Sequence, residues 1–393
     1  MYCYLRFNKV FNANENFYLY TTLAFLTDTS EEKMSIFEGF DNHEQVVFCN
    51  DQHSGLKAII AIHNTQLGPA LGGCRMYPYT SETAALTDVL RLSRSMTYKA
   101  AVANINLGGG KSIIIGDPKK HISEALFRTF GRFVNSLGGR YITAEDVGTS
   151  VDHMEWISYE TKYVVGLSTH LGGLGDPSPV TAHGTFVGIK AAIKSTKGVD
   201  NLAGIKVAIE GIGHVGYYLC KELHAHGARL YVSDINPEAT KRAADEFGAI
   251  VVDCDKIYSL DVDVYAPCAL GATINDKTIP QFKCSIIAGA ANNQLDKEMI
   301  HASELTKKGI LYAPDFVINA GGLINVYTEV EGFHKERALE KTENIYPTLL
   351  KIFALAHKEK ISTAEAANQI AEQRIREVTK VGHIYSTHNR YKD

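Results

Sequence analysis

Two lysines and one aspartate lie in a stretch that is otherwise rich in glycine and small apolar residues. Lys99 ends the sequence Met-Thr-Tyr-Lys, Lys111 follows three consecutive glycines, and Asp146 lies within Ala-Glu-Asp-Val-Gly. Glycine has no Cβ, so this backbone could approach a ligand closely. Two amines in one poorly solvated pocket disfavour each other's charge, so one could act as a base while the other holds a carboxylate. Either lysine alone is better explained as a surface residue beside a glycine turn, but their combination with Asp146 favours a site.

A second glycine-rich sequence has the pattern of a dinucleotide-binding loop. Gly211, Gly213 and Gly216 form Gly-x-Gly-x-x-Gly between a strand-like apolar run and a helical pattern, and the next apolar run ends at Asp234. This context fits the dinucleotide fingerprint better than a glycine-rich turn without a ligand. Gly211 would make the turn, Gly213 would admit the pyrophosphate, and Gly216 would let helix and strand pack. Asp234 would accept from the ribose hydroxyls and repel a 2′-phosphate, which predicts NAD rather than NADP.

The elements that position the lysines and the aspartate follow from hydrophobic periodicity. The pattern predicts three strands and two helices, at 57–62, 113–115 and 141–143 and at 81–96 and 126–137. The first helix would deliver Lys99 into the site from its C-terminal end, and the last of these strands leads to Asp146. The glycine-punctuated sequence 67–75 is predicted to be a loop, with Leu71 and Gly72 in the wall of a small-molecule pocket.

Strands and loops alternate in the second half of the chain. After the Gly- and Pro-rich segment 171–179, a helix is predicted from 180 to about 195, and the strands are predicted at 206–210, 230–234, 262–265, 285–288 and 310–312. Strand-then-loop repeats place the loops at the carboxyl edge of one parallel sheet, facing the cofactor. From about 336 the chain is predicted to be helical to near 379, with a break around 360–363.

These patterns predict an α/β fold with two domains. Residues 34–175 would form an N-terminal α/β catalytic domain, and residues 176–361 a Rossmann-type dinucleotide-binding domain. A C-terminal helix, at about 362–393, would rejoin the first domain. Residues 1–33 lack a compact basic start followed by an uninterrupted apolar core, so we interpret them as a dispensable extension rather than a secretory signal.

Composition excludes several classes of protein. The 393 residues are 45% hydrophobic and 21% charged, which is ordinary for a globular chain of two domains. The net charge of −4 argues against nucleic-acid binding, and no apolar run has membrane-spanning length. Seven scattered cysteines without metal-ligand spacing indicate reduced thiols, a cytoplasmic location and no metal site.

Taken together, the motifs resemble the amino-acid dehydrogenase family that includes glutamate, leucine, valine and phenylalanine dehydrogenases. The likeness runs from about Glu44 to about Arg376 and is closest to the leucine dehydrogenases, on four motifs: Gly68–Gly73, Met96–Lys99, Leu107–Lys111 and Thr143–Gly148. The resemblance implies that Lys99 binds the substrate carboxylate, Lys111 is the catalytic base and Asp146 assists proton transfer.

The resemblance also implies the activity, the cofactor contacts and the assembly. The activity would be reversible, NAD-dependent oxidative deamination of L-leucine and other branched-chain L-amino acids to the 2-oxo acid and ammonia. Thr181 and Asn293 would lie near the nicotinamide, the two domains would flank a cleft, and the subunits would assemble as an octamer. The family positions that line the side-chain pocket correspond to Leu71, Gly72, Ala144, Leu323 and Val326.

Two features of the sequence depart from the family pattern, and two other functions can be set against the family activity. Glu210 precedes the dinucleotide fingerprint where a neutral residue is usual, and the sequence at 321–327 is more like the aromatic-acid members, including tryptophan dehydrogenase. The second departure leaves an aromatic substrate as an alternative. A hydroxy-acid dehydrogenase would need a His or Arg to polarise the substrate carbonyl. This site offers two lysines and an aspartate instead, so that function is disfavoured. A catalytically silent nucleotide-binding protein is disfavoured because Lys99, Lys111 and Asp146 are all present.

Overall fold

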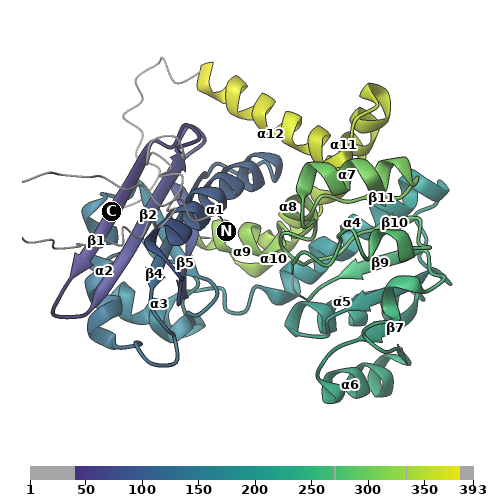
Figure 1. Cartoon of the computed structure of the whole chain (residues 1–393), viewed down its shortest axis with the longest axis horizontal. Helices are drawn as coiled ribbons and strands as arrows, with labels where there is room; N and C mark the ends of the chain where they lie inside the picture. Colours follow the sequence, from purple (N-terminus) through teal and green to yellow (C-terminus); the bar gives the residue numbers. More distant parts are fainter. Residues whose placement is uncertain (1–39, 270, 333, 381–393) are drawn as a thin grey trace, which may run out of the picture. The chain divides into compact units, whose positions relative to one another are not determined.

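The chain forms two β-sheets from successive parts of the sequence, as Figure 1 shows. The computed structural model describes residues 40–269, 271–332 and 334–380, all within the compact unit that begins at Gly39. The predicted extension at 1–33 lies outside the described residues. The α/β fold class is confirmed, whereas the domain boundaries at 175 and 361 stay predictions.

The first sheet has five strands in the order β1-β2-β4-β3-β5. Its strands are β1 (Gln45–Asp51), β2 (Leu56–Asn64), β3 (Ala70–Tyr77), β4 (Gly108–Ile115) and β5 (Tyr141–Glu145). The helices of this part are α1 (Glu82–Val102), α2 (Glu124–Ser136) and α3 (Val151–Ser158). β3 pairs in parallel with both β4 and β5 and so lies between the strand that carries Lys111 and the strand that leads to Asp146.

The loop predicted over 67–75 is wrong from Ala70 onward, because this sequence forms the buried strand β3. A Cβ on Gly72 would lie 1.8 Å from the carbonyl oxygen of Gly110 in β4. A Cβ on Gly109 would lie 2.1 Å from Oγ1 of Thr97 in α1. Gly72 therefore allows the close approach of strand β4 and Gly109 that of helix α1, and neither glycine marks a turn.

Helix α1 extends six residues beyond its predicted end at 96. Ser81 caps its N-terminus by accepting a hydrogen bond from the backbone N–H of Ala84, at 3.1 Å. Lys99 consequently lies in the last turn of α1 and does not follow the helix. Its position is set by the packing of α1 on β4.

The second sheet has six parallel strands in the order β11-β10-β9-β6-β7-β8. The strands are β6 (Lys206–Glu210), β7 (Arg229–Ser233), β8 (Ile250–Val251), β9 (Val264–Pro267), β10 (Ile286–Ile287) and β11 (Leu311–Tyr312). This is the strand order of the doubly wound dinucleotide-binding fold, in which ligands bind where the order reverses, here between β6 and β9.

Nine helices accompany the second sheet in the described part of the chain. They are α4 (Ser178–Lys197), α5 (His214–Ala225), α6 (Pro237–Phe247), α7 (Glu298–Lys307), α8 (Asp315–Ile318), α9 (Gly321–Val330), α10 (Lys335–Thr342), α11 (Ile345–Glu359) and α12 (Thr363–Thr379). Three short 3₁₀ turns complete the structure: η1 (Thr169–Leu171), η2 (Ile257–Ser259) and η3 (Ile279–Gln281).

The last helix, α12, contacts α1 through a capping arginine. Nη1 of Arg374 donates to the carbonyl oxygens of Ala100, Ala101 and Ile105 at 3.2, 2.8 and 3.0 Å. A cation at the C-terminal end of a helix satisfies carbonyls that have no partner within the helix and complements the helix dipole. α12 therefore fixes the end of α1 at which Lys99 lies.

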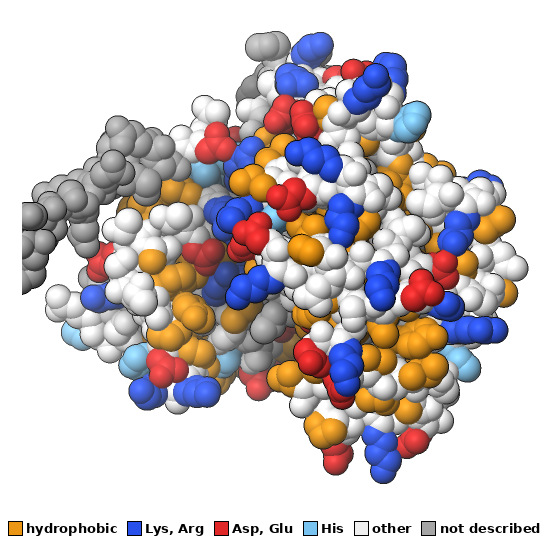
Figure 2. All heavy atoms as spheres, turned by 45° about the vertical axis from the view of Figure 1, so that its right-hand side comes forward, with side chains coloured by type: hydrophobic (Ala, Val, Ile, Leu, Met, Phe, Trp, Pro, Cys, Tyr) orange, Lys and Arg blue, Asp and Glu red, His pale blue; other side chains and the backbone are white. Residues whose placement is uncertain are grey.

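Charge and polarity of the surface agree with an ordinary globular protein. Figure 2 shows acidic and basic side chains interspersed on the face in view, so neither charge occupies this face alone. Within the described ranges, no helix combines the length and apolar character needed to cross a bilayer. The six described cysteines are all free thiols.

His63, a buried histidine on β2, gives the fold a predicted sensitivity to acid. It is only 8% exposed, with Nδ1 2.8 Å from Oγ1 of Thr97 and Nε2 3.1 Å from the carbonyl oxygen of Asp41. Burial lowers its pKa from 6.5 to about 4. The unfolded chain therefore binds a proton first as the pH falls, and His63 contributes a loss of about 2 kcal/mol of stability between pH 7 and pH 5.

Denaturant unfolding at pH 7 and pH 5 checks this expectation. His63→Asn should lose less stability on acidification than the unsubstituted protein, by about 2 kcal/mol. His53→Asn, which changes an exposed histidine, serves as the control. An equal acid-induced loss in the His63 variant and the unsubstituted protein would show that this histidine does not carry the effect.

Candidate active site

Lys111 and Asp146 form an ion pair across the first sheet. Nζ of Lys111 lies 2.9 Å from Oδ2 of Asp146, and the Lys111 side chain is only 8% exposed. Nε of Arg75, on the intervening strand β3, donates to the same oxygen at 3.0 Å. Burial alone would raise the pKa of Asp146, but Lys111 and Arg75 together hold it below its usual value. Asp146 is therefore kept as a carboxylate in direct contact with the predicted base.

Lys99 is the lysine whose charge is disfavoured in the structure. Burial lowers its pKa from 10.5 to about 8, and nearby Lys111 contributes in the same direction. Asp315 and Asp146 oppose this shift by favouring the ammonium form. The sequence predicts a disfavoured ammonium at Lys111 beside Lys99, whereas in the structure it is Lys99 whose pKa is lowered. A carboxylate-bearing ligand would supply the negative charge that this amine lacks.

Asp315, at the start of α8, is a site residue that the sequence motifs do not identify. Its carboxylate accepts from the backbone N–H of Gln294 at 3.0 Å and of Phe316 at 2.7 Å. Burial raises its pKa, while these hydrogen bonds and Lys99 oppose the increase. An acid shortly after a strand of a parallel sheet was the signal that could have found it. The Asp315 carboxylate lies near Lys99 of α1 and accepts a hydrogen bond from the loop before α7.

The predicted dinucleotide loop has the required backbone geometry. Gly211 has a φ of +93°, and a Cβ there would lie 2.7 Å from the backbone nitrogen of Ala269. A Cβ on Gly216 would lie 2.0 Å from the carbonyl oxygen of Gly211, so this glycine permits the helix to pack on the turn. Gly213, at the N-cap of α5, has no atom within 4 Å of its Cβ position. The loop and the helix N-terminus thus leave room and N–H groups suited to a pyrophosphate.

Asp234 follows β7 and lies beside this loop. Its Oδ2 accepts from the backbone N–H of Ile212 at 2.6 Å, and its Oδ1 accepts from Asn236 at 2.8 Å. The next residue, Ile235, is 94% exposed. The carboxylate is therefore fixed against the glycine turn, and its remaining lone pairs are available to a ribose.

Thr181 and Asn293 occupy positions set by close backbone contacts. Thr181 lies in the first turns of α4, where its Oγ1 would be 3.0 Å from a Cβ placed on Gly322 at the start of α9. Asn293 is exposed and has a φ of +50°, and its backbone N–H contacts Asp315. The loop of Asn293 is thereby joined to the carboxylate that faces Lys99.

Four of the five predicted pocket residues belong to one apolar cluster. Leu71, Ala144 and Leu323 are buried within it, and Val326 packs against it. The structure thus brings residues of β3, β5 and α9 into the same core. Gly72 differs, because its lack of a side chain is required by the contact of β3 with β4.

Glu210, the unusual acid before the dinucleotide loop, has its charge taken up by two tyrosines. The hydroxyl of Tyr258 donates to Oε1 at 2.7 Å, and the hydroxyl of Tyr265 donates to Oε2. Burial holds the pKa of Tyr265 well above its usual value, so this phenol remains a donor. These contacts tie η2 and β9 to the end of β6 and account for an acid at this position.

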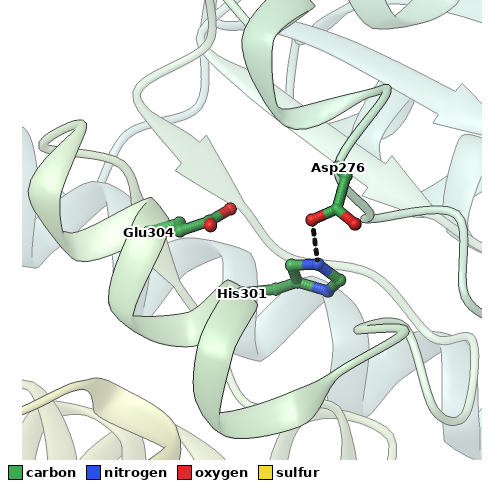
Figure 3. A group of neighbouring side chains, drawn as sticks. All are labelled: Asp276, His301 and Glu304. Atoms are coloured by element: carbon green, nitrogen blue, oxygen red, sulfur yellow. Dashed lines mark hydrogen bonds and ion pairs between the residues drawn. The ribbon is translucent and has the colours of Figure 1, made fainter.

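Among the described residues, one group has the composition of a cation site, and its hydrogen bonding disfavours that role. Figure 3 shows Asp276 and His301 in contact and Glu304 without a marked interaction with either. Nδ1 of His301 accepts from the backbone N–H of Lys297 at 3.0 Å, so Nε2 carries the proton and donates to Asp276 at 3.1 Å. Nζ of Lys297 also pairs with Asp276, at 3.0 Å. A metal needs an unprotonated ring nitrogen, so this cluster fits the capping of α7 better than metal binding.

The chain matches known proteins over both sheets. Residues 43–163 match the family model of the Glu/Leu/Phe/Val dehydrogenase dimerisation domain. Residues 234–386 match the model described as glutamate/leucine/phenylalanine/valine dehydrogenase. Each match includes residues of the candidate site, namely Lys99, Lys111 and Asp146 in the first and Asp315 in the second.

Individual relatives are similar over most of their length. The chain is 56% identical to leucine dehydrogenase of Bacillus cereus, over 87% of this chain and 94% of the relative. It is 54% identical to L-tryptophan dehydrogenase of Nostoc punctiforme (85% and 93%) and 50% identical to phenylalanine dehydrogenase of Bacillus thermotolerans (90% and 94%).

A solved structure agrees with the described fold. The crystal structure of L-tryptophan dehydrogenase from Nostoc punctiforme has a TM-score of 0.78 and 52% identity, and the match covers 86% of this chain and 97% of that one. The chain therefore belongs to the Glu/Leu/Phe/Val dehydrogenase family and is an amino-acid dehydrogenase.

Proposed function

We propose that the chain catalyses the reversible, NAD-dependent oxidative deamination of L-leucine and other branched-chain L-amino acids to the 2-oxo acid and ammonia. The observation that carries this proposal is the 2.9 Å ion pair between Lys111 and Asp146, together with Lys99, whose lowered pKa leaves it in need of an anion. Lys111 with Asp146 can transfer a proton, and Lys99 can bind a carboxylate. Oxidative deamination of an amino acid requires both functions.

We assign the roles of the site residues from these contacts together with the family resemblance. NAD, when bound, supplies the hydride acceptor, and the dinucleotide loop with Asp234 and Thr181 fits its pyrophosphate, ribose and nicotinamide ends. The Lys99 ammonium binds the substrate carboxylate. Lys111, in its neutral form, accepts one proton, either from the substrate ammonium or from the water that adds to the imine carbon. Asp146, in contact with Lys111, passes protons to the leaving amine as the 2-oxo acid forms.

The side-chain pocket implied by the family resemblance favours a branched aliphatic substrate. Leu71, Ala144, Leu323 and Val326 offer no charge partner, so a glutamate side chain would be left unpaired and would be rejected. Leu323 is a bulky residue buried in this cluster, which reduces the room for an indole. An aromatic substrate remains the alternative, favoured by the sequence at 321–327 and by the 54% identity to a tryptophan dehydrogenase.

Asp234 is expected to impose a preference for NAD over NADP. A 2′-phosphate would lie against its carboxylate, and like charges brought together cost several kcal/mol, so we expect kcat/KM to favour NAD by roughly 100-fold. Asp234→Gly should narrow this ratio at least about tenfold. Arg242 pairs with Glu246 at 2.9 Å and lies over the ring of Tyr217, and these contacts oppose its movement toward a 2′-phosphate. Equal initial rates with NAD and NADP at low concentration would refute the assignment.

Absorbance at the NADH band tests the reaction class. The purified protein should reduce NAD with L-leucine and should oxidise NADH with the corresponding 2-oxo acid only when ammonia is present. The 2-hydroxy analogue of leucine should give no NADH, whereas a hydroxy-acid dehydrogenase would prefer it. NAD binding without turnover of any amino acid would instead favour the catalytically silent alternative.

The resemblance to the leucine enzymes also supports a homo-octamer. We propose this assembly, and the mass of the protein in solution, compared with the 43.2 kDa chain, tests it.

A further inference from the structure

Arg75 contacts both the proposed proton-transfer pair and helix α1. Its Nε donates to Oδ2 of Asp146 at 3.0 Å, and its Nη1 donates to Oδ2 of Asp88 in α1 at 3.0 Å. The hydroxyl of Tyr79 donates to the same oxygen of Asp88 at 2.5 Å. The guanidinium therefore spans two carboxylates that belong to different elements, and Asp88 is itself held by a third group.

The charges in this cluster balance. Lys111 and Arg75 supply two positive charges, and Asp146 and Asp88 supply two negative charges. The ionic side chains of Arg75, Asp88 and Asp146 are 23%, 26% and 21% exposed, so the cluster is largely screened from solvent. At such a position a missing partner leaves a charge uncompensated, which is more damaging than the same loss on the surface.

We propose that Arg75 is a positioning residue for Asp146 in the amino-acid dehydrogenase reaction, holding its carboxylate ionised and aligned with Lys111. This inference rests on the proton-transfer role proposed above for Asp146. Arg75 does not reach the substrate in this account. It acts by keeping Asp146 able to receive a proton from Lys111 and to return it.

The groups around Asp146 show why Arg75 matters. Burial raises the pKa of this carboxyl, and Lys111 from β4 and Arg75 from β3 are the cations that lower it. The more distant Lys99 from α1 also faces it. The remaining titratable neighbours are acids: Glu145 at the end of β5, the thiol of Cys74 and the phenol of Tyr141. Without Arg75, a single close cation would have to offset burial, and Lys111 and Asp146 would tend to share one proton and become a neutral pair.

The planar guanidinium suits this position better than an ammonium. An arginine presents several N–H donors in a fixed fork, so it can bind one carboxylate through Nε and another through Nη1. A lysine offers a point charge on a flexible stem and would choose between Asp146 and Asp88. Arg75→Lys should therefore retain part of the function, and Arg75→Met very little.

The test compares Arg75→Met, Arg75→Lys and Arg75→Ala with Arg132→Met. Arg132 is an exposed arginine of α2 that pairs with Glu160, so its loss serves as the matched control and should leave kcat within twofold. We expect Arg75→Met to lower kcat by about 100-fold and the affinity for NAD to change less than twofold. The acid limb of the kcat/KM profile should move to higher pH, and millimolar guanidinium should restore part of the activity of Arg75→Ala.

A thermal double-mutant cycle provides a readout that does not depend on turnover. Arg75→Met should lower Tm clearly in the unsubstituted protein. In the Asp146→Asn background the loss of Tm should be much smaller, because the negative charge that Arg75 pairs with is then absent. Equal Tm losses in both backgrounds, a kcat within threefold of normal, or an unmoved acid limb would each overturn the inference. An unsubstituted protein inactive with every L-amino acid would overturn the proposed function instead, and the cycle would still decide whether Arg75 stabilises ionised Asp146.

Discussion

Lys111→Ala is expected to lower kcat for L-leucine by at least about 10²–10⁴-fold, the usual effect of losing a general base. The expectation rests on the contact of Nζ with Asp146 at 2.9 Å and on the burial of Lys111 at the centre of the first sheet. NAD affinity should remain nearly unchanged, because the dinucleotide loop belongs to the second sheet. Initial rates and NAD titration measure the two effects separately.

Lys57→Ala is the control for the Lys111 variant. Lys57 is an exposed lysine on the neighbouring strand β2, so its removal should leave the rate unchanged. Near-normal turnover in Lys111→Ala would refute the assignment of the base. A joint loss of activity and NAD binding would show that the substitution disturbs more than the site.

Lys99→Met is expected to have opposite effects on catalysis and stability. Removing the partner of a buried carboxylate typically costs about 2–5 kcal/mol, so kcat/KM for L-leucine should fall by roughly 30-fold to several thousand-fold. The free protein should become more stable at pH 7. The pKa of Lys99 is about 8 in the folded protein, compared with 10.5 for a lysine in the unfolded chain. Below pH 8, the protonated Lys99 therefore lowers the free energy of unfolding by up to about 3 kcal/mol.

The pH dependence distinguishes this explanation from a general packing effect. Between pH 8 and pH 10.5 the unfolded chain still binds the proton that folded Lys99 has lost, so the stability of the unsubstituted protein rises with pH over this window. The advantage of Lys99→Met should therefore be largest at pH 7 and should shrink by pH 10. The loss of the cation near Asp315 will offset part of the gain.

Denaturant unfolding at pH 7 and pH 10, with Lys57→Met as the control, checks the stability effect of Lys99. A less stable Lys99 variant at pH 7 would contradict the account. An unchanged KM for L-leucine would contradict the carboxylate-binding role.

The sequence predicted best where the signal is local. The strand, glycine turn, helix and second strand from Lys206 to Asp234 form one continuous pattern, and the structure has each element within one residue of its predicted place. Lys99, Lys111 and Asp146 were likewise identified from short motifs. Periodicity and motif spacing contain the information for such elements.

Features that depend on partners far apart in sequence could not be predicted in this way. β3 was interpreted as a loop because the reason for its glycines lies in the backbone of Gly110, which is distant in sequence. Arg75 gained its role only from contacts with Asp88 and Asp146, and Asp315 only from its proximity to Lys99. A single sequence does not show which charged residues fold against each other.

Comparison of kcat/KM for L-leucine, L-valine, L-isoleucine, L-phenylalanine and L-tryptophan, each with NAD, tests the proposed reaction and substrate most directly. The apolar pocket that we propose from Leu71, Ala144, Leu323 and Val326 predicts that the branched-chain substrates are preferred. The margin over phenylalanine should be modest, because apolar pockets discriminate by only about 1–3 kcal/mol per methylene. A higher kcat/KM for phenylalanine or tryptophan than for leucine would contradict the account and favour an aromatic-acid dehydrogenase.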